Sequence, residues 1–185
     1  MIDVNQLRKG TTFTDNGELY KVLDYRHQKP GRGKATIRVS VRNLRSGSIT
    51  EMTYNSGERV EDVKMESRDV EYLYDDGEFL IFMDTTTFEQ PQANREVFAD
   101  ALPYLKENLP LKLLEFEGEL IDYTLPINVD YKVIEAEMAI AGDTANNPSK
   151  KVTIETGLSV SVPMFVNAGD TIRVKTEDGS YVTRV

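Results

Sequence analysis

The chain has 185 residues, with 22 lysines and arginines against 31 aspartates and glutamates, so its net charge is −9. It has no cysteine and one histidine, His27, which excludes disulfides, thiolate metal sites, cysteine nucleophiles and histidine clusters. No segment approaches the roughly 18 apolar residues of a membrane helix, and the first residues lack the basic and then apolar pattern of a signal peptide. We therefore expect a cytoplasmic protein with no metal, no cofactor and no membrane partner.

Two runs in the first third of the chain, 19–25 and 35–41, alternate between apolar and polar residues. Both are rich in β-branched and aromatic residues, which is typical of strands. In the second run the apolar side chains point to one face, while Arg38 and, just past the run, Arg42 lie on the other. This pattern predicts a strand with a buried face and a basic face.

Positive charge is concentrated around the second run. Between Asp24 and Glu51 no acidic residue occurs, and the basic residues there are Arg26, Lys29, Arg32, Lys34, Arg38, Arg42 and Arg45. A basic arm on an acidic body binds nucleic acid locally, while the body repels nonspecific association. A solvated strand face has the same composition, so charge alone leaves both interpretations open.

Residues 29–34, Lys-Pro-Gly-Arg-Gly-Lys, form the sharpest local feature. Pro30 fixes one backbone angle, and glycines at 31 and 33 allow positive φ on both sides of Arg32. A hairpin of this kind would hold one guanidinium at its tip, where its planar donors suit phosphates or bases. An ordinary turn with an exposed arginine fits as well. The third glycine of a dinucleotide fingerprint and the ending of a P-loop are both missing, so a nucleotide site is not expected.

Residues 64–126 are strongly acidic, with 15 acidic and 5 basic residues. Their carboxylates fall in predicted turns and on polar strand faces, and no EF-hand loop is present. We therefore expect no catalytic residue and no metal ligand in this segment.

Short strands separated by turn signals predict small β-barrels or sandwiches, not alternating β-α units. One helix is predicted over 101–109, where apolar residues recur at helical spacing and Pro110 ends the pattern. Changes of pattern near residues 63 and 127 predict three units, 1–63, 64–126 and 127–185.

Motifs along the whole chain, in the same order, resemble those of bacterial translation elongation factor P. The tip loop, Lys29-Pro30-Gly31-Arg32-Gly33-x-Ala35, is the first of these. Further matches are Tyr54-Asn55-Ser56-Gly57, Phe82-Met83-Asp84 with Thr87-Phe88-Glu89-Gln90, Gly142-Asp143-Thr144, Val160-x-Val162-Pro163-x-Phe165 and Asp178-Gly179-x-Tyr181. This collinearity is stronger support than any single motif.

The resemblance implies an all-β fold of three small β-barrel domains. An SH3-like (KOW-type) barrel would occupy 1–63, and two OB-folds would occupy 64–126 and 127–185. The resemblance also implies a monomer that is elongated and resembles tRNA in outline.

The implied function is that of a translation elongation factor, not an enzyme. Such a factor binds both ribosomal subunits between the peptidyl-tRNA and exit sites and stimulates peptide-bond formation at stalled consecutive prolines. The ribosomal RNA performs the reaction, and the tip residue positions the acceptor end of the peptidyl-tRNA.

The resemblance assigns roles to particular residues. Arg32 is the functional tip, and the tip loop around it comprises Lys29, Pro30, Gly31, Gly33 and Lys34. The expected RNA contacts are Arg26, Arg38, Arg42, Arg45, Tyr181 and Arg184. The loop expected to face the exit-site mRNA codon contains Gly142, Asp143 and Thr144.

An arginine at the tip separates this chain from the branch that is β-lysylated on lysine. The arginine branch includes members that a modifying enzyme rhamnosylates on that residue, and members with no established modification. Lys34 stands where small or neutral residues are commoner, so it offers a second basic end to the loop.

The alternative is an OB-fold RNA-binding module that acts off the ribosome, such as an RNA chaperone. Such a module is expected to have a basic groove with stacking aromatic residues. The acidic segment 64–126 argues against it.

Overall fold

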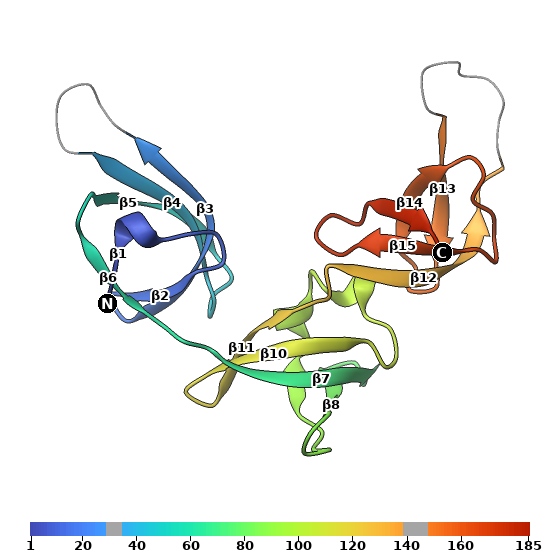
Figure 1. Ribbon diagram of the computed structural model, residues 1–185. Helices are drawn as coiled ribbons and strands as arrows, with labels where there is room; N and C mark the ends of the chain where they lie inside the picture. Colours follow the sequence, from blue (N-terminus) through green and yellow to red (C-terminus); the bar gives the residue numbers. More distant parts are fainter. Residues whose placement is uncertain (29–34, 139–147) are drawn as a thin grey trace. The chain divides into compact units, whose positions relative to one another are not determined.

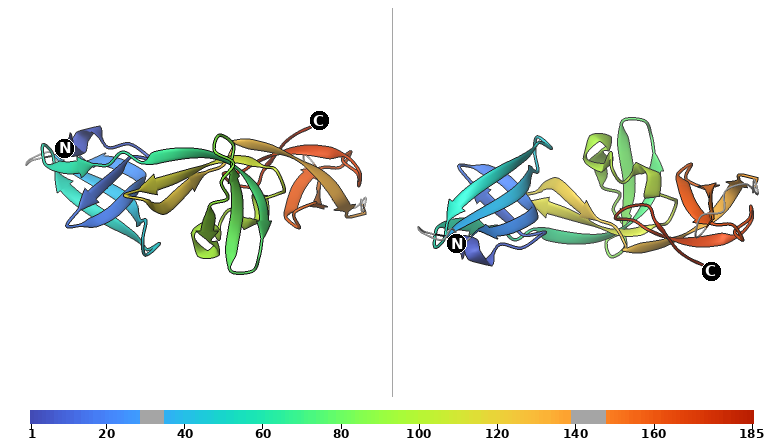
Figure 2. Two further views of the ribbon diagram at one scale, coloured as in Figure 1. Left: turned by 90° about the horizontal axis from the view of Figure 1, so that it is seen from below. Right: turned by 90° about the horizontal axis from the view of Figure 1, so that it is seen from above.

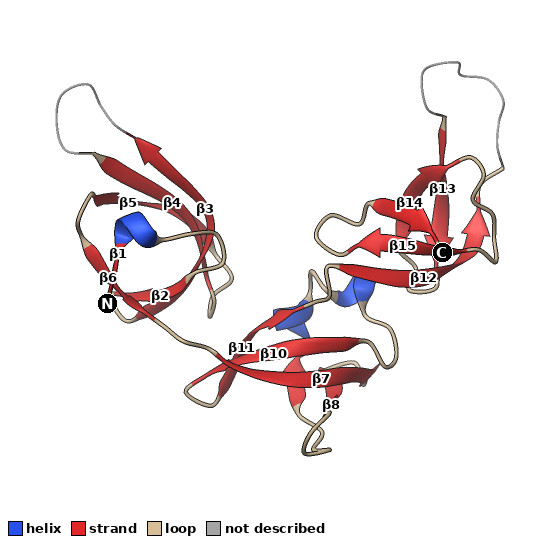
Figure 3. Ribbon diagram, in the orientation of Figure 1, coloured by secondary structure: helices blue, strands red, loops and turns tan. Residues whose placement is uncertain are grey.

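The computed structural model describes residues 1–28, 35–138 and 148–185 (Figures 1 and 3). In these ranges the protein is all-β, as predicted, and its strands form three sheets. The helical segments of the described chain are short 3-10 turns. Among the described residues, no helix has the length and apolarity to cross a membrane.

The first sheet curves into a barrel around an apolar core (Figures 1 and 2), with strand order β1-β6-β2-β3-β4-β5. Its elements are β1 (Ile2–Asp3), η1 (Val4–Gln6), β2 (Thr12–Asp15), β3 (Glu18–Gln28), β4 (Thr36–Asn43), β5 (Ile49–Asn55) and β6 (Arg59–Asp62). Phe13 and the apolar side chains of β4 are fully buried in this core. The strands predicted over 19–25 and 35–41 are confirmed as parts of β3 and β4.

The second sheet has the order β11-β10-β7-β8-β9. Its strands are β7 (Glu66–Asp75), β8 (Phe79–Asp84), β9 (Gln92–Asn94), β10 (Pro110–Phe116) and β11 (Glu119–Thr124), with the turns η2 (Arg95–Phe98) and η3 (Leu102–Tyr104). Its core is aromatic, because the ring of Phe98 lies 4.4 Å from that of Tyr123 and 5.1 Å from that of Phe82.

The prediction of a helix over 101–109 is wrong except for one short turn. The chain is helical only at Leu102–Tyr104, and Leu105 already has an extended backbone with ψ at 126°. Asn108 is left-handed, with φ at 62°, which turns the chain into β10 at Pro110. The apolar spacing instead buries Leu105 and Leu109 from an irregular segment.

The third sheet is antiparallel, with order β14-β13-β12-β15-β16. Its strands are β12 (Asn128–Ala136), β13 (Ser149–Ile154), β14 (Ser159–Pro163), β15 (Thr171–Lys175) and β16 (Tyr181–Arg184). Tyr131, Ile154 and Ile172 are fully buried and form the centre of its core.

The described chain divides into two compact units, residues 1–67 with 114–122 and residues 68–113 with 123–185. The tip of the β10–β11 hairpin belongs to the first unit, where Lys21 Nζ donates to Asp122 Oδ2 at 2.5 Å. In the second unit the Tyr131 hydroxyl donates to the carbonyl oxygen of Tyr104 at 2.6 Å. Division into three domains near residues 63 and 127 stays a prediction.

Candidate nucleic-acid interface

The predicted tip loop joins the ends of β3 and β4. These strands pair antiparallel from Tyr20 opposite Asn43 to Gln28 opposite Thr36, with one register shift between Val22 and Asp24. The tip residues lie outside the described part of the chain, and they are Lys29, Pro30, Gly31, Arg32, Gly33 and Lys34. The structure therefore supplies the hairpin strands that carry the tip.

Strand β4 has the two faces that the sequence predicts. Ile37, Val39 and Val41 are fully buried, whereas Arg38 is exposed on the opposite face. Burying each apolar side chain of this size contributes about 1.5 to 3 kcal/mol, so the register of β4, and with it the outward direction of Arg38, is strongly fixed.

A bulge in β3 decides which of its residues join that outer face. Val22 pairs with Val41 and Asp24 with Ser40, so one extra residue lies between Val22 and Asp24. Beyond the bulge the alternation is shifted, and Arg26 lies directly opposite Arg38. Directly paired residues in an antiparallel sheet share a face, so these two guanidinium groups lie on the same outer surface.

Two like charges in this position repel each other, which destabilises the sheet. Each guanidinium has a carboxylate beside it: Arg26 Nε donates to Asp24 Oδ2 at 3.2 Å, and Arg38 Nη1 lies 3.6 Å from Glu51 Oε1. Both side chains stay accessible, at 74% exposed for Arg26 and 48% for Arg38. Exposed ion pairs of this kind contribute little to stability, so both arginines keep donors for an external anion.

Arg42 and Arg45 differ in position from this pair. Arg42 lies on the same face, opposite Lys21, and is partly buried. Arg45 lies in the turn after β4, where its Nε is 3.7 Å from Glu119 Oε2. The structure thus brings Arg26 and Arg38 together, leaves Arg42 at the other end of the face, and directs Arg45 toward the β10–β11 hairpin.

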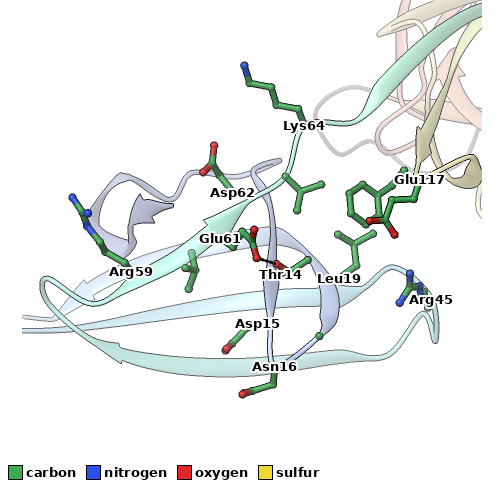
Figure 4. A pocket seen from close by; sticks show the side chains of 14 residues that line it. Thr14, Asp15, Asn16, Leu19, Arg45, Arg59, Glu61, Asp62, Lys64 and Glu117 are labelled. Carbon is green, nitrogen blue, oxygen red and sulfur yellow. Dashed lines mark hydrogen bonds between the residues drawn. The ribbon is translucent and has the colours of Figure 1, made fainter.

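Arg45 also lines a cavity of about 630 Å³ within the first unit (Figure 4). The ionisable residues of its lining mix both signs, and they are Asp15, Glu61, Asp62, Glu117, Arg45, Arg59 and Lys64. Thr14 Oγ1 donates to Glu61 Oε2 at 3.3 Å across one wall. With more carboxylates than cations, this cavity is a poor phosphate site.

The C-terminal candidates, Tyr181 and Arg184, lie on β16 in the second unit. The Arg184 guanidinium stands 5.2 Å from the centre of the Phe165 ring, and its Nη1 is 3.6 Å from Asp170 Oδ2. Tyr181 lines a groove of about 1020 Å³ that also includes Phe165. Phe165 is 55% exposed and contacts the Arg184 guanidinium, which its place in a sequence motif did not indicate.

The predicted codon-facing residues, Gly142, Asp143 and Thr144, lie outside the described residues, between β12 and β13. Across residues 1–28, 35–138 and 148–185, no group of three or more histidines and carboxylates is placed to hold a metal ion.

Three family models match the chain in order. The elongation factor P (EF-P) KOW-like domain matches residues 3–60, the elongation factor P (EF-P) OB domain matches 65–123, and the C-terminal domain of elongation factor P matches 129–184. The chain belongs to the elongation factor P family. It is therefore a translation elongation factor of a family that binds the ribosome, and not an enzyme.

Two solved structures similar to this elongation factor P family member are named as translation initiation factors. Eukaryotic translation initiation factor 5A from Methanococcus jannaschii matches with a TM-score of 0.51 at 21% identity, over 68% of this chain and 90% of that one. A translation initiation factor eIF-5A family protein from Naegleria fowleri matches with a TM-score of 0.42 at 11% identity, over 67% of this chain and 96% of that one. The first similarity supports the fold alone, and the second carries no argument.

Proposed function

We propose that this protein binds the ribosome between the peptidyl-tRNA and exit sites and stimulates peptide-bond formation at consecutive prolines. Arg32, at the tip of the β3–β4 hairpin, positions the acceptor end of the peptidyl-tRNA. The observation that carries the proposal is the pair of exposed guanidinium groups of Arg26 and Arg38 on the outer face of the hairpin that leads to Arg32. Such a face suits the phosphates that flank a tip inserted into RNA.

The physical basis is positioning. Proline is a poor nucleophile and a constrained donor, so its reaction gains from a partner that holds the reacting ends in a productive geometry. The hairpin suits this role because β3 and β4 stand on a barrel whose core side chains are fully buried. A rigid scaffold keeps a tip residue closer to its target geometry than a free loop would.

The same proposal covers the remaining partners. Tyr181 and Arg184 contact the peptidyl-tRNA and small subunit, and residues 142–144 face the exit-site codon. Arg32 is the residue that an arginine-modifying enzyme rhamnosylates in hosts that have one. The protein acts as a cytoplasmic monomer.

An RNA-binding module acting off the ribosome is the second candidate. The exposed Phe165 ring beside Arg184 favours it, because aromatic and arginine planes stack on unpaired bases. Binding to assembled ribosomes and to unstructured RNA of the same concentration separates the two. The ribosomal function predicts tight binding to ribosomes alone, and equal binding to both would favour the second candidate.

The direct test of the proposed function is an in vitro translation system that lacks this factor. Addition of the purified protein is expected to raise the yield of a reporter with consecutive prolines and to leave a proline-free reporter unchanged. An equal effect on both reporters, or none, would contradict the proposal.

A further inference from the structure

The loop between β8 and β9 presents an aromatic ring to solvent. Phe88 lies in this loop with φ at 60°, and it is 72% exposed. A bulky residue is uncommon in the left-handed region, because this conformation costs free energy. The conformation persists only where the surrounding structure holds it. Because the ring adds almost nothing to the core, the fold itself does not explain phenylalanine at this position.

The loop is held in shape by one buried carboxylate. Asp84 is 5% exposed, and its Oδ1 accepts hydrogen bonds from the backbone N–H groups of Thr86 and Thr87, at 2.8 Å each. The Phe88 N–H donates to the Asp84 carbonyl at 2.9 Å, and the Asp84 N–H donates to the Glu89 carbonyl at 2.8 Å. The backbone that carries the ring is therefore preorganised, which lowers the entropy that a partner must overcome on binding.

An apolar groove adjoins the same loop. It has a volume of about 330 Å³ and reaches the loop through Thr85, whose N–H and hydroxyl both donate to the Asp69 carbonyl. Its apolar lining consists of Val70, Pro110, Leu111, Leu125 and Pro126. The centres of protein–protein interfaces are typically rich in exposed aromatic side chains and apolar surface, as found here.

The charges of this surface disfavour RNA. Arg68 Nε lies 3.4 Å from Asp84 Oδ2 and its Nη1 lies 3.8 Å from Glu89 Oε2, while Lys112 Nζ is 2.9 Å from Asp69 Oδ1. These cations are thus already paired with carboxylates. The segment 64–126, all of it described, carries 15 acidic and 5 basic residues, so it repels phosphates and attracts basic surfaces.

We propose that the Phe88 loop and the adjoining groove dock a protein partner that offers an apolar pocket with a basic rim. On the ribosome this partner is a protein component and not ribosomal RNA. The inference rests on the proposed ribosome binding, but it is independent of the role of Arg32.

The test uses the full chain with p-benzoylphenylalanine in place of Phe88 and purified ribosomes as the probe. Light-induced crosslinks at this position are expected to be sensitive to protease and resistant to ribonuclease. The same label at Tyr74, which is 53% exposed on β7 of the same sheet, serves as the matched control and is expected to crosslink much less. Crosslinks to ribosomal RNA, or no crosslink above the Tyr74 control, would overturn the inference.

A second measurement separates binding from folding. Asparagine tolerates positive φ better than phenylalanine, so Phe88→Asn is expected to leave thermal stability unchanged or raise it. Loss of an aromatic anchor is expected to weaken ribosome binding by roughly tenfold or more, with the salt dependence unchanged. Unaltered affinity of Phe88→Asn would overturn the inference while the proposed function stands. An unmodified chain that fails to bind ribosomes would contradict both.

Discussion

Arg26 and Arg38 carry the proposed interface at the scale of single residues. They lie directly opposite each other on β3 and β4, and both remain exposed beside their carboxylate neighbours. A fold without a polyanionic partner gains nothing from placing two guanidinium groups side by side, because like charges in this position are destabilising.

We predict that the double variant Arg26→Gln, Arg38→Gln binds ribosomes more weakly and with a flatter salt dependence. Each lost phosphate contact removes roughly 0.7 to 0.9 from the log-log slope on simple nucleic acids, so two contacts remove roughly 1.4 to 1.8. Stability should be unchanged or slightly higher, because the repulsion is relieved. Affinities measured across a salt series check this, with Arg95→Gln, at a half-exposed arginine of the acidic segment 64–126, as the control that leaves the slope unchanged. An unaltered slope in the double variant would mean that this strand face contacts water and no phosphate groups.

Asp84 is the residue whose ionisation supports the Phe88 loop. The backbone N–H groups of Thr87 and Thr86, followed by the charge of Arg68, hold the pKa of this carboxyl below its usual range. An unfolded aspartate titrates near about 4. A depressed folded pKa gives stabilisation that is complete above that value and is lost as the pH falls through the folded pKa.

We therefore predict that Asp84→Asn lowers stability at neutral pH and removes part of the acid sensitivity. The free energy of unfolding of the unaltered protein should fall from about pH 4 downward, and the variant should lose less over the same range. Urea unfolding at several pH values measures both. Parallel pH curves for the two proteins would show that Asp84 does not contribute in this way.

At the scale of elements, much of the hairpin could be predicted from the sequence. The alternation of Ile37, Val39 and Val41 with Arg38 fixes both faces of β4, because a strand has a period of two. The bulge after Val22 could not be predicted, since register depends on the partner strand. The direction of Arg45 likewise depends on the β10–β11 hairpin, which is distant in sequence.

The helix prediction over 101–109 was wrong for the same reason, because the conformation of this segment depends on residues that are distant in sequence. Apolar spacing at 3.6 residues predicts a helix, yet a segment packed between sheets buries Leu105 and Leu109 with an irregular backbone. The left-handed backbone of Phe88 could not be predicted either, because no sequence pattern indicates positive φ at a phenylalanine.

The link between η3 and β12 is a further feature of this scale. The buried Tyr131 hydroxyl donates to the Tyr104 carbonyl at 2.6 Å, and burial is the main cause that raises the Tyr131 pKa. We predict that Tyr131→Phe costs about 1 kcal/mol, the usual net value of one hydrogen bond. Urea unfolding gives the difference, with the exposed Tyr74→Phe as a control expected to change stability by less than about 0.5 kcal/mol. A loss no larger than the control would show that this bond contributes nothing to stability.

At the scale of the whole molecule, charge is divided unevenly along the chain. Residues 1–63 carry a net charge of +3, residues 64–126 carry −10, and residues 127–185 carry −2. This distribution favours contact with RNA through residues 1–63, and the acidic segment 64–126 opposes nonspecific RNA binding. The order of motifs along the sequence was sufficient to predict the family, because this order does not depend on the three-dimensional arrangement of the strands.

The most direct test of the central claim is the effect of Arg32→Ala in a strain that lacks its own elongation factor P. Arg59→Ala, at an exposed arginine on β6 with no assigned RNA contact, is the matched control, and the amount of each protein should be equal. We predict that Arg32→Ala reduces a consecutive-proline reporter to the level of the deletion strain, while a proline-free reporter is unchanged and Arg59→Ala retains activity. Full rescue by Arg32→Ala would contradict the assignment of the tip.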